Sequence, residues 1–244
     1  MNPMRRSRWE KVVDFHSHIL PRMDDGSRNT QESLEMLRTS AAQGIRVMAA
    51  TPHFYAEENS VERFLERRET AWKALSEKME AGMPKVLPGA EVYYFEGMQR
   101  TESLSRLKIE GTNLLLLEMP FAPWSDRMIA EIMEINRMPD TQVVLAHIER
   151  YLRFQKAAVW DSLLENGVLM QANASFFLHR FSKHKALHMV KKGRIHLLGS
   201  DCHNMDSRPP QLGAAMEILS ARHLLQGIED LGKNLIPEKE VCAQ

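Results

Sequence analysis

The sequence lacks the features that mark secreted or membrane-spanning proteins. It contains only two cysteines, Cys202 and Cys242, which are too few for a disulfide framework. Its apolar runs are short, such as 114–117, whereas about twenty apolar residues are needed to span a bilayer. No apolar run follows the basic residues near the N-terminus, as one would in a secretory signal. We therefore expect a cytoplasmic protein with reduced thiols that is not inserted in a membrane.

The balance of charge argues against a nucleic-acid partner. The chain has 32 Lys and Arg against 32 Asp and Glu, so its formal net charge is zero. Binding to nucleic acid would require a basic excess or a clustered basic stripe. With 244 residues, 43% of them hydrophobic, the chain can bury one large core. Because no linker, repeat or low-complexity segment interrupts it, we predict a single domain over 1–244, with flexible tails at about 1–10 and 237–244.

Strand-like and helix-like segments alternate along the chain. Short apolar runs predict seven strands at 12–16, 45–50, 85–92, 114–118, 142–146, 168–172 and 195–199. Helical spacing and capping signals predict helices at about 29–44, 60–79, 125–137, 156–165, 182–192 and 211–225. Nearly continuous apolar strands separated by helices are typical of a parallel sheet covered by helices. The expected fold class is α/β, and seven such units could close into a TIM-like barrel with its site at the C-terminal ends of the strands.

Histidines and carboxylates stand at the ends of six of the seven predicted strands. The candidates are His16 and His18, then His53, Glu91, Glu118, His147, and finally Asp201 and His203. Asp25 is a ninth candidate, although Asp-Gly at 25–26 is also typical of an ordinary turn. Each residue alone is more often structural, but imidazoles and carboxylates are the ligands of divalent cations, and their repetition favours a metal site.

The number of candidate ligands exceeds the needs of one ion. Two or three divalent ions would use them, with Glu91 free to bridge. Clustered ions suit hydrolysis of a phosphate ester, because one ion activates water while others neutralise phosphate oxygens. Arg150 and Arg208 follow two of the candidate histidines closely, and a guanidinium can grip a phosphate bidentately. The alternative for each arginine is a surface position or a salt bridge to Glu149 or Asp206.

A second phosphatase signature is hidden in the same region. Cys202 and Arg208 form the C-x5-R pattern of cysteine-dependent tyrosine phosphatases, and the pattern follows a predicted strand. Such a loop wraps phosphate in backbone N–H groups, so glycines help and acidic residues harm. The intervening residues include Asp206 and no glycine. A neighbouring Asp201 would also raise the thiol pKa, so we expect Cys202 to be a small side chain behind the metal site.

Several motifs together resemble the PHP-family bacterial tyrosine phosphatases, which are associated with capsular and exopolysaccharide synthesis loci. The motifs are DFHSHILP (14–21), DDG (24–26), TPH (51–53), PGAE (88–91), LLEMP (116–120), AHIERY (146–151), GSDCHN (199–204) and RPP (208–210). They occur in order over nearly the whole chain, from about Val12 to Leu225. The combined set is specific, although each motif alone is not.

The resemblance implies a distorted (βα)7 barrel of the PHP type that holds three metal ions, often manganese and sometimes iron or zinc. By position, it assigns the first ion to His16, His18, Glu91 and Asp201, the second to Glu91, Glu118 and His147, and the third to Asp25, His53 and His203. Arg150 and Arg208 match the arginines that contact phosphate in the family. The implied substrate is phosphotyrosine on the tail of a membrane-associated bacterial tyrosine autokinase.

Two other functions remain open at this stage. A PHP phosphatase for a small molecule such as histidinol phosphate would have the same ligands. A non-catalytic assembly module is disfavoured by the complete ligand set. The chain also departs from the family pattern, since Arg22 and Met23 stand where relatives usually have a glycine followed by a small or apolar residue. The sequence does not decide whether the protein forms a homo-oligomer.

Overall fold

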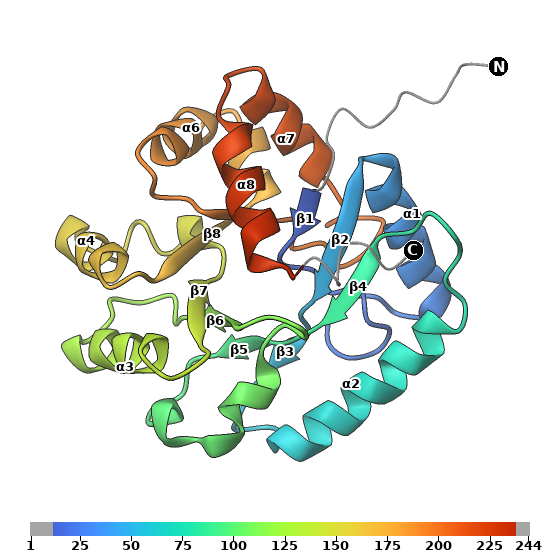
Figure 1. Ribbon diagram of the computed structural model, residues 1–244, viewed down its shortest axis with the longest axis horizontal. Coiled ribbons are helices and arrows are strands. Elements are labelled where there is room, and N and C mark those ends of the chain that lie inside the picture. The colour runs from blue at the N-terminus through green and yellow to red at the C-terminus, as the bar shows by residue number, and fades with distance from the viewer. Residues whose placement is uncertain (1–11, 238–244) are drawn as a thin grey trace.

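The computed structural model describes residues 12–237 and shows a mixed α/β fold built on parallel strands (Figure 1). The strands are β1 Val12–Asp14, β2 Ile45–Ala50, β3 His53–Phe54, β4 Lys85–Pro88, β5 Glu91–Tyr93, β6 Leu114–Glu118, β7 Gln142–Leu145, β8 Leu169–Asn173 and β9 Leu197–Gly199. They form two sheets, with the orders β1-β2-β4 and β3-β5-β6-β7-β8-β9. The tails predicted at 1–10 and 237–244 lie outside the described residues, except for Pro237.

Short breaks in two strands separate the sheets. β2 and β3 are divided by residues 51–52, and β4 and β5 by residues 89–90. Backbone bonds continue across the breaks, since Gly89 N donates to Ala50 O at 2.8 Å and Glu91 N donates to Pro52 O at 3.0 Å. The strand predicted over 85–92 is therefore two strands, which continue in the same direction on either side of the break.

The first and last strands of the chain lie side by side. Phe15 N donates to Leu198 O at 3.1 Å, and Asp201 N donates to His16 O at 2.8 Å. His18 N in turn donates to Cys202 O at 2.9 Å. These bonds bring the segment after β1 next to the segment after β9, although almost the whole chain separates them in sequence.

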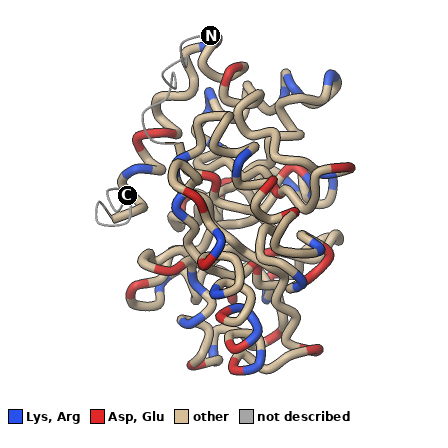
Figure 2. The backbone as a smooth tube through the Cα atoms, turned by 90° about the vertical axis from the view of Figure 1, so that its right-hand side faces the viewer, with Lys and Arg blue, Asp and Glu red and all other residues tan. Residues whose placement is uncertain are grey.

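Helices surround the strands (Figure 1). They are α1 Thr30–Ala42, α2 Val61–Ser76, α3 Asp126–Asn136, α4 Ala157–Glu165, α5 Ala174–Leu178, α6 Lys183–Lys191, α7 Leu212–Ser220 and α8 Leu225–Leu235, with 3-10 helices η1 Met98–Arg100, η2 Glu102–Leu107 and η3 Ile148–Arg150. Viewed from the side of α1 and α2, acidic and basic residues are interspersed along the chain (Figure 2). Within 12–237 no helix combines the length and apolar character required to cross a membrane.

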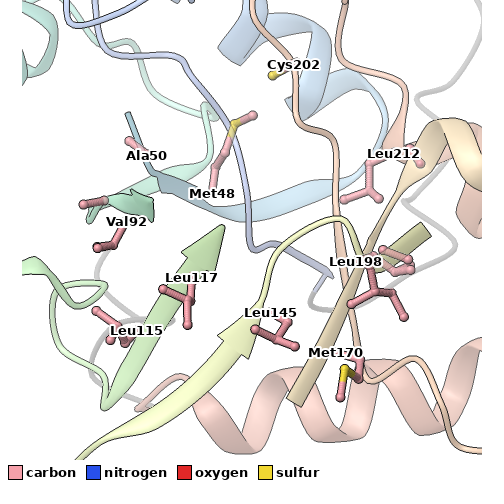
Figure 3. Close-up of a cluster of buried hydrophobic side chains, with 14 of the residues drawn as sticks. Met48, Ala50, Val92, Leu115, Leu117, Leu145, Met170, Leu198, Cys202 and Leu212 are labelled. Atoms are coloured by element: carbon pink, nitrogen blue, oxygen red, sulfur yellow. The ribbon is translucent and has the colours of Figure 1, made fainter. Parts of the chain in front are cut away.

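The core has two layers that share the strands. Leu115, Leu117 and Leu145 belong to the larger cluster, which Figure 3 shows with Met48, Met170 and Leu198. The neighbouring residues Leu116 and Val144 belong to a second cluster. Successive side chains of a strand point to opposite faces, so one face packs under the helices and the other fills the space between the strands.

The helices differ from the prediction at α2, α5, α7 and α8. The helix predicted over 211–225 ends already at Ser220, and α8, which begins at Leu225, was not predicted. α7 ends in a Schellman motif in which Leu224 N donates to Leu219 O and His223 N donates to Ser220 O, both at 3.0 Å. His223 takes the left-handed conformation at φ 56°, where glycine is the usual residue. The helix α5 was not predicted, and α2 ends at Ser76, before Met79.

Candidate active site

The residues predicted to bind metal converge from distant parts of the chain. His16 and His18 follow β1, His53 and Glu91 follow the two strand breaks, Glu118 ends β6, His147 follows β7, Asp201 and His203 follow β9, and Asp25 lies in the loop before α1. Seven of them are buried; His53 is 16% exposed at its side chain and Asp25 is 68% exposed. The cluster therefore lies inside the molecule and opens toward Asp25.

The first group of donor atoms surrounds one point. His16 Nε2 and His18 Nε2 lie 3.1 Å apart, and they lie 3.2 and 3.4 Å from Glu91 Oε2. Asp201 Oδ1 lies 3.6 and 3.4 Å from the same two nitrogens. Ligands held about 2.1 Å from one ion are roughly 3 Å from each other, so these four atoms have the spacing of a metal site.

The second group uses the other oxygen of Glu91. His147 Nε2 lies 2.7 Å from Glu91 Oε1 and 3.5 Å from Glu118 Oε1. His53 Nδ1 also approaches this group, at 3.0 Å from Glu91 Oε2 and 3.7 Å from Glu118 Oε2. Glu91 thus faces both groups, as its predicted bridging role requires.

The third group gathers around the exposed carboxylate of Asp25. Its Oδ1 lies 3.5 Å from His53 Nε2 and 3.4 Å from His203 Nε2. His203 Nδ1 is 3.0 Å from Asp201 O, a carbonyl that can only accept a hydrogen bond. The proton of His203 therefore belongs on Nδ1, and the Nε2 lone pair faces Asp25.

The residues present fit divalent cations. Three of the donor atoms, His53 Nδ1, Glu91 Oε2 and His203 Nε2, are buried without a hydrogen-bond partner among the described residues. Burying a polar atom without a partner is unfavourable, and cations bound in the groups to which these atoms belong would satisfy them. Histidine nitrogens mixed with carboxylate oxygens suit manganese, iron and zinc.

The two central carboxylates stay ionised despite their burial. Burial alone would raise the pKa of Glu91, but His16 and His147 hold that pKa well below its usual range. Burial opposes ionisation of Asp201 as well, and His16 and His18 hold its pKa well below the usual range. Both residues therefore present negative charge to the space between the imidazoles.

Both predicted arginines contact the cluster through one carboxylate. Arg150 and Arg208 each donate from a terminal guanidinium nitrogen to Asp201 Oδ2, at 2.5 and 2.6 Å. Their side chains are 35% and 37% exposed, and both line a pocket of about 230 Å³. Their acidic partner is neither Glu149 nor Asp206, which were the alternatives considered from the sequence.

Four further residues contact the candidate ligands, and the sequence assigned none of them a role. Asp24 lies 2.7 Å from His18 Nδ1 and accepts from His53 N at 2.8 Å, so it orients two histidines. Tyr151 OH lies 3.1 Å from His147 Nδ1. The other two are Gln171 and Asn173 on β8.

β8 is the one predicted strand that has no candidate ligand at its end, yet its side chains contact candidate ligands that follow three other strands. Gln171 Oε1 is 3.2 Å from His16 Nδ1 and accepts from His147 N at 2.7 Å. Gln171 Nε2 donates to Asn173 Oδ1 at 2.9 Å, and Asn173 Nδ2 donates to Asp201 Oδ2 at 2.6 Å. Two polar residues at alternate positions of an otherwise apolar strand were the available signal.

Arg22 and Met23, which depart from the family pattern, affect the backbone conformation of their loop. Arg22 has a φ of 61°, in the left-handed region that favours glycine. Arg22 N donates to Ser27 O at 2.8 Å and closes the loop that carries Asp24 and Asp25. The loop keeps the conformation expected of a glycine there, so the departure leaves Asp25 in the cluster.

The geometry contradicts a cysteine nucleophile. Cys202 is fully buried, and burial raises the pKa of its thiol, with Asp14 and Asp201 adding to the effect. The backbone N–H groups of residues 206, 207 and 208 all donate to Asn204 Oδ1, at 3.0, 2.8 and 3.1 Å. They are therefore not directed at the sulfur, where a cysteine-dependent phosphatase would bind phosphate.

Comparison with known proteins places these features in a family. The chain is 29% identical over 229 residues to the tyrosine-protein phosphatase CpsB of Streptococcus pneumoniae, covering 87% of this chain and 91% of that protein. It is also 29% identical over 221 residues to the tyrosine-protein phosphatase YwqE of Bacillus subtilis, covering 85% and 84%.

A solved structure of these relatives also matches the chain. It comes from work on YwqE of Bacillus subtilis and CpsB of Streptococcus pneumoniae, described as metal-dependent tyrosine phosphatases, and matches with a TM-score of 0.75 at 25% identity. The match covers 92% of this chain and 91% of that one. The profile of the family described as "Capsular polysaccharide synthesis, CpsB/CapC" matches residues 12–232. The chain therefore belongs to the CpsB/CapC family of capsular polysaccharide synthesis.

Proposed function

We propose that this protein is a cytoplasmic, metal-dependent protein-tyrosine phosphatase. Its substrate would be phosphotyrosine on a bacterial tyrosine autokinase, and its action would regulate capsular or exopolysaccharide synthesis. The observation that carries the proposal is the convergence of three groups of imidazole and carboxylate donors with two arginines on Asp201. The names of the relatives and of the matching structure support the same activity.

The proposed architecture is a distorted (βα)7 barrel with the metal site at the C-terminal ends of its strands. β2 with β3, and β4 with β5, each count as one interrupted strand, which gives seven strands in the predicted order. The bonds between the segments after β1 and β9 support closure of this barrel. Three manganese ions would use the three donor groups as the resemblance assigns them.

The residues of the chain would each perform a definite task in hydrolysis. Bound divalent ions would lower the pKa of a water molecule and neutralise phosphate oxygens. Arg150 and Arg208 would donate to the phosphoryl oxygens and stabilise the charge of the transition state. Asp201 holds both guanidinium groups through Oδ2, so they are oriented before substrate arrives. Asp24 fixes His18, and Gln171 fixes His16, in the orientations that direct Nε2 into the cluster.

An exposed aromatic ring near the arginines favours an aromatic substrate. Phe121 is 48% exposed, its ring centroid lies 6.3 Å from that of His147, and the Arg150 guanidinium carbon lies 6.0 Å from its centroid. A phosphotyrosine ring could pack against Phe121 while its phosphate meets Arg150. Histidinol phosphate, the alternative substrate, offers a smaller and more polar group to the same surface.

Turnover on a phosphotyrosine peptide and on histidinol phosphate separates the two phosphatase functions. We expect a much higher kcat/KM on the peptide, loss of activity with a chelator and recovery with Mn²⁺. Cys202→Ser should retain most activity, because water and not the thiol attacks phosphorus. A chelated enzyme that stays active, together with an inactive Cys202→Ser variant, would falsify the metal mechanism. Preference for histidinol phosphate would select the alternative, and a metal-free protein without turnover would indicate an assembly module.

A further inference from the structure

A basic surface around α6 is not explained by the proposed activity. Although the net charge of the chain is zero, residues 166–200 contain no Asp or Glu. The same stretch contains Arg180, Lys183, Lys185, Lys191, Lys192 and Arg194, together with His179, His184, His188 and His196. The zero net charge of the whole chain conceals this basic segment.

The basic side chains of this segment are largely unpaired. Arg194 donates to Asp161 at 2.5 Å. Within residues 12–237, no ion pair involves any of the other five lysines and arginines of the segment. Lys185, Lys191 and Lys192 are exposed. On the flank of α1 and α2, by contrast, basic and acidic residues are interspersed (Figure 2). The α6 flank therefore carries five basic side chains without an ion-pair partner among the described residues.

An apolar groove runs along this basic edge. It lies between α4 and α6 and has a volume of about 540 Å³. Trp160, Leu164 and Met189 are among the apolar residues that line it, and Lys185 and Lys192 stand at its edge. Grooves of this kind bind amphipathic segments, whose apolar side chains enter the groove while charged ones meet the rim.

The groove is separate from the metal cluster. Its wall includes Met170 of β8, whereas Gln171, the next residue, points to the ligands His16 and His147. Adjacent side chains of a strand point to opposite faces, so the groove lies on the helical side of the sheet and the cluster on the other. An occupant of the groove would leave the cluster accessible.

We infer that the groove between α4 and α6 is a docking site for an acidic polypeptide segment of another protein, with apolar residues that anchor it. Such a segment would complement the charge of the groove, since Lys185 and Lys192 line it and residues 166–200 contain no acidic residue. The apolar surface is concave, and this shape favours a peptide over a lipid bilayer, because a bilayer would make better contact with a convex surface. The inference does not depend on the proposed phosphatase activity.

Fluorescence anisotropy with a labelled peptide tests the inference. The probe is a short peptide of glutamate with leucine and phenylalanine at helical spacing. We expect saturable binding to the full-length protein that weakens with salt. Lys185→Glu combined with Lys192→Glu should weaken binding by about tenfold or more, because both rim charges are reversed. Ala157→Trp, which fills the groove at the start of α4, should also weaken it.

Matched controls distinguish this site from non-specific attraction. Lys73→Glu combined with Lys78→Glu reverses two exposed charges on the flank of α2 and should leave peptide binding unchanged. An otherwise identical peptide with alanine in place of leucine and phenylalanine should bind weakly. Equal binding of this alanine peptide, or equal losses in both double variants, would overturn the inference. Binding to phosphatidylglycerol vesicles that needs Lys185 and Lys192, without peptide binding, would also overturn it in favour of a membrane surface.

Discussion

At the residue scale, two of the proposed metal ligands hold unusual backbone conformations. His147 has a φ of 32° and Asp201 a φ of 52°, in the left-handed region that costs a non-glycine residue roughly 1 kcal/mol or more. Backbone bonds fix both turns, since Arg150 N donates to His147 O at 3.0 Å and Asp201 N donates to His16 O at 2.8 Å. The conformations direct both side chains into the cluster, and no sequence pattern announces them.

Glu91 is the residue whose loss should affect the most ions. Its Oε2 faces His16 and His18, and its Oε1 faces His147. We predict that Glu91→Ala loses at least two metal ions and nearly all activity, because one carboxylate serves two groups. Metal analysis of the purified variant, alongside its turnover, checks this. Full metal content with near-normal turnover would show that Glu91 is not a ligand.

Gln171 should act through the ligands that it orients. We predict that Gln171→Met weakens Mn²⁺ binding about tenfold to a hundredfold, because methionine fills the space but cannot bond to His16 or to the backbone of His147. Calorimetric titration of the metal-free protein measures this. Gln142→Met is the matched control, because Gln142 bonds to Asn136 and Gly167, away from the ligands. Equal Mn²⁺ affinities in the two variants would exclude a positioning role.

The arginines should affect turnover without affecting the metals. We predict that Arg150→Ala and Arg208→Ala each keep their metal content and lower kcat/KM by roughly tenfold to a thousandfold, about 1.4 to 4 kcal/mol. Lysine should rescue either variant poorly, since the planar fork is lost. Steady-state kinetics on a phosphotyrosine peptide gives the values, and an unchanged kcat/KM would remove that arginine from the mechanism.

At the scale of elements, the ends of strands are packed too closely for larger residues. A Cβ added at Gly199, the last residue of β9, would lie 2.5 Å from His16 Cβ and 2.7 Å from Gln171 Nε2. We predict that Gly199→Ala destabilises the protein by about 1 to 3 kcal/mol and lowers its metal content, because His16 must move. Thermal unfolding and metal analysis measure both effects.

Gly227 in α8 is the matched control for this substitution. A Cβ there would meet no atom within 4 Å. We expect Gly227→Ala to be neutral or to stabilise the protein by up to about 1 kcal/mol, because alanine is the better helix former. If Gly199→Ala proves as harmless as Gly227→Ala, the close contact with His16 does not constrain β9.

The starts of helices could be predicted from the sequence where a capping residue marks them. Asn29, Ser60 and Ser125 each accept a backbone N–H at the start of a helix, as their positions in the sequence predict. The end of α7 at Ser220 was missed because His223 replaces the glycine that usually marks a left-handed helix end. The short strand β3 and the break between β4 and β5 were missed. At that second break Gly89 lies against a residue far away in sequence, since a Cβ there would lie 3.0 Å from Ile109 Cγ1.

At the scale of the whole molecule, the convergence of the proposed ligands could be predicted because of topology. Parallel strands with the same direction bring their C-terminal ends to one side, so residues such as His16 and Asp201 meet although they are far apart in the chain. The supporting residues could not be predicted in the same way. Gln171 and Asn173 have meaning only once the order of β7, β8 and β9 is known. The basic groove likewise requires knowledge of which helices are neighbours.

The stability of the whole molecule should depend on the bound ions. Without cations, the ionised carboxylates of Glu91 and Asp201 stay buried, together with the unpartnered nitrogens His53 Nδ1 and His203 Nε2. Ions that bind only the folded chain add about 2.7 kcal/mol for each site at a concentration a hundred times Kd. We predict that a chelator lowers the Tm by several degrees and that Mn²⁺ restores both the Tm and the activity. Scanning calorimetry with parallel assays follows the two together. If activity disappears on chelation while the Tm stays constant, the ions bind too weakly to be part of the folded protein and must arrive with the substrate.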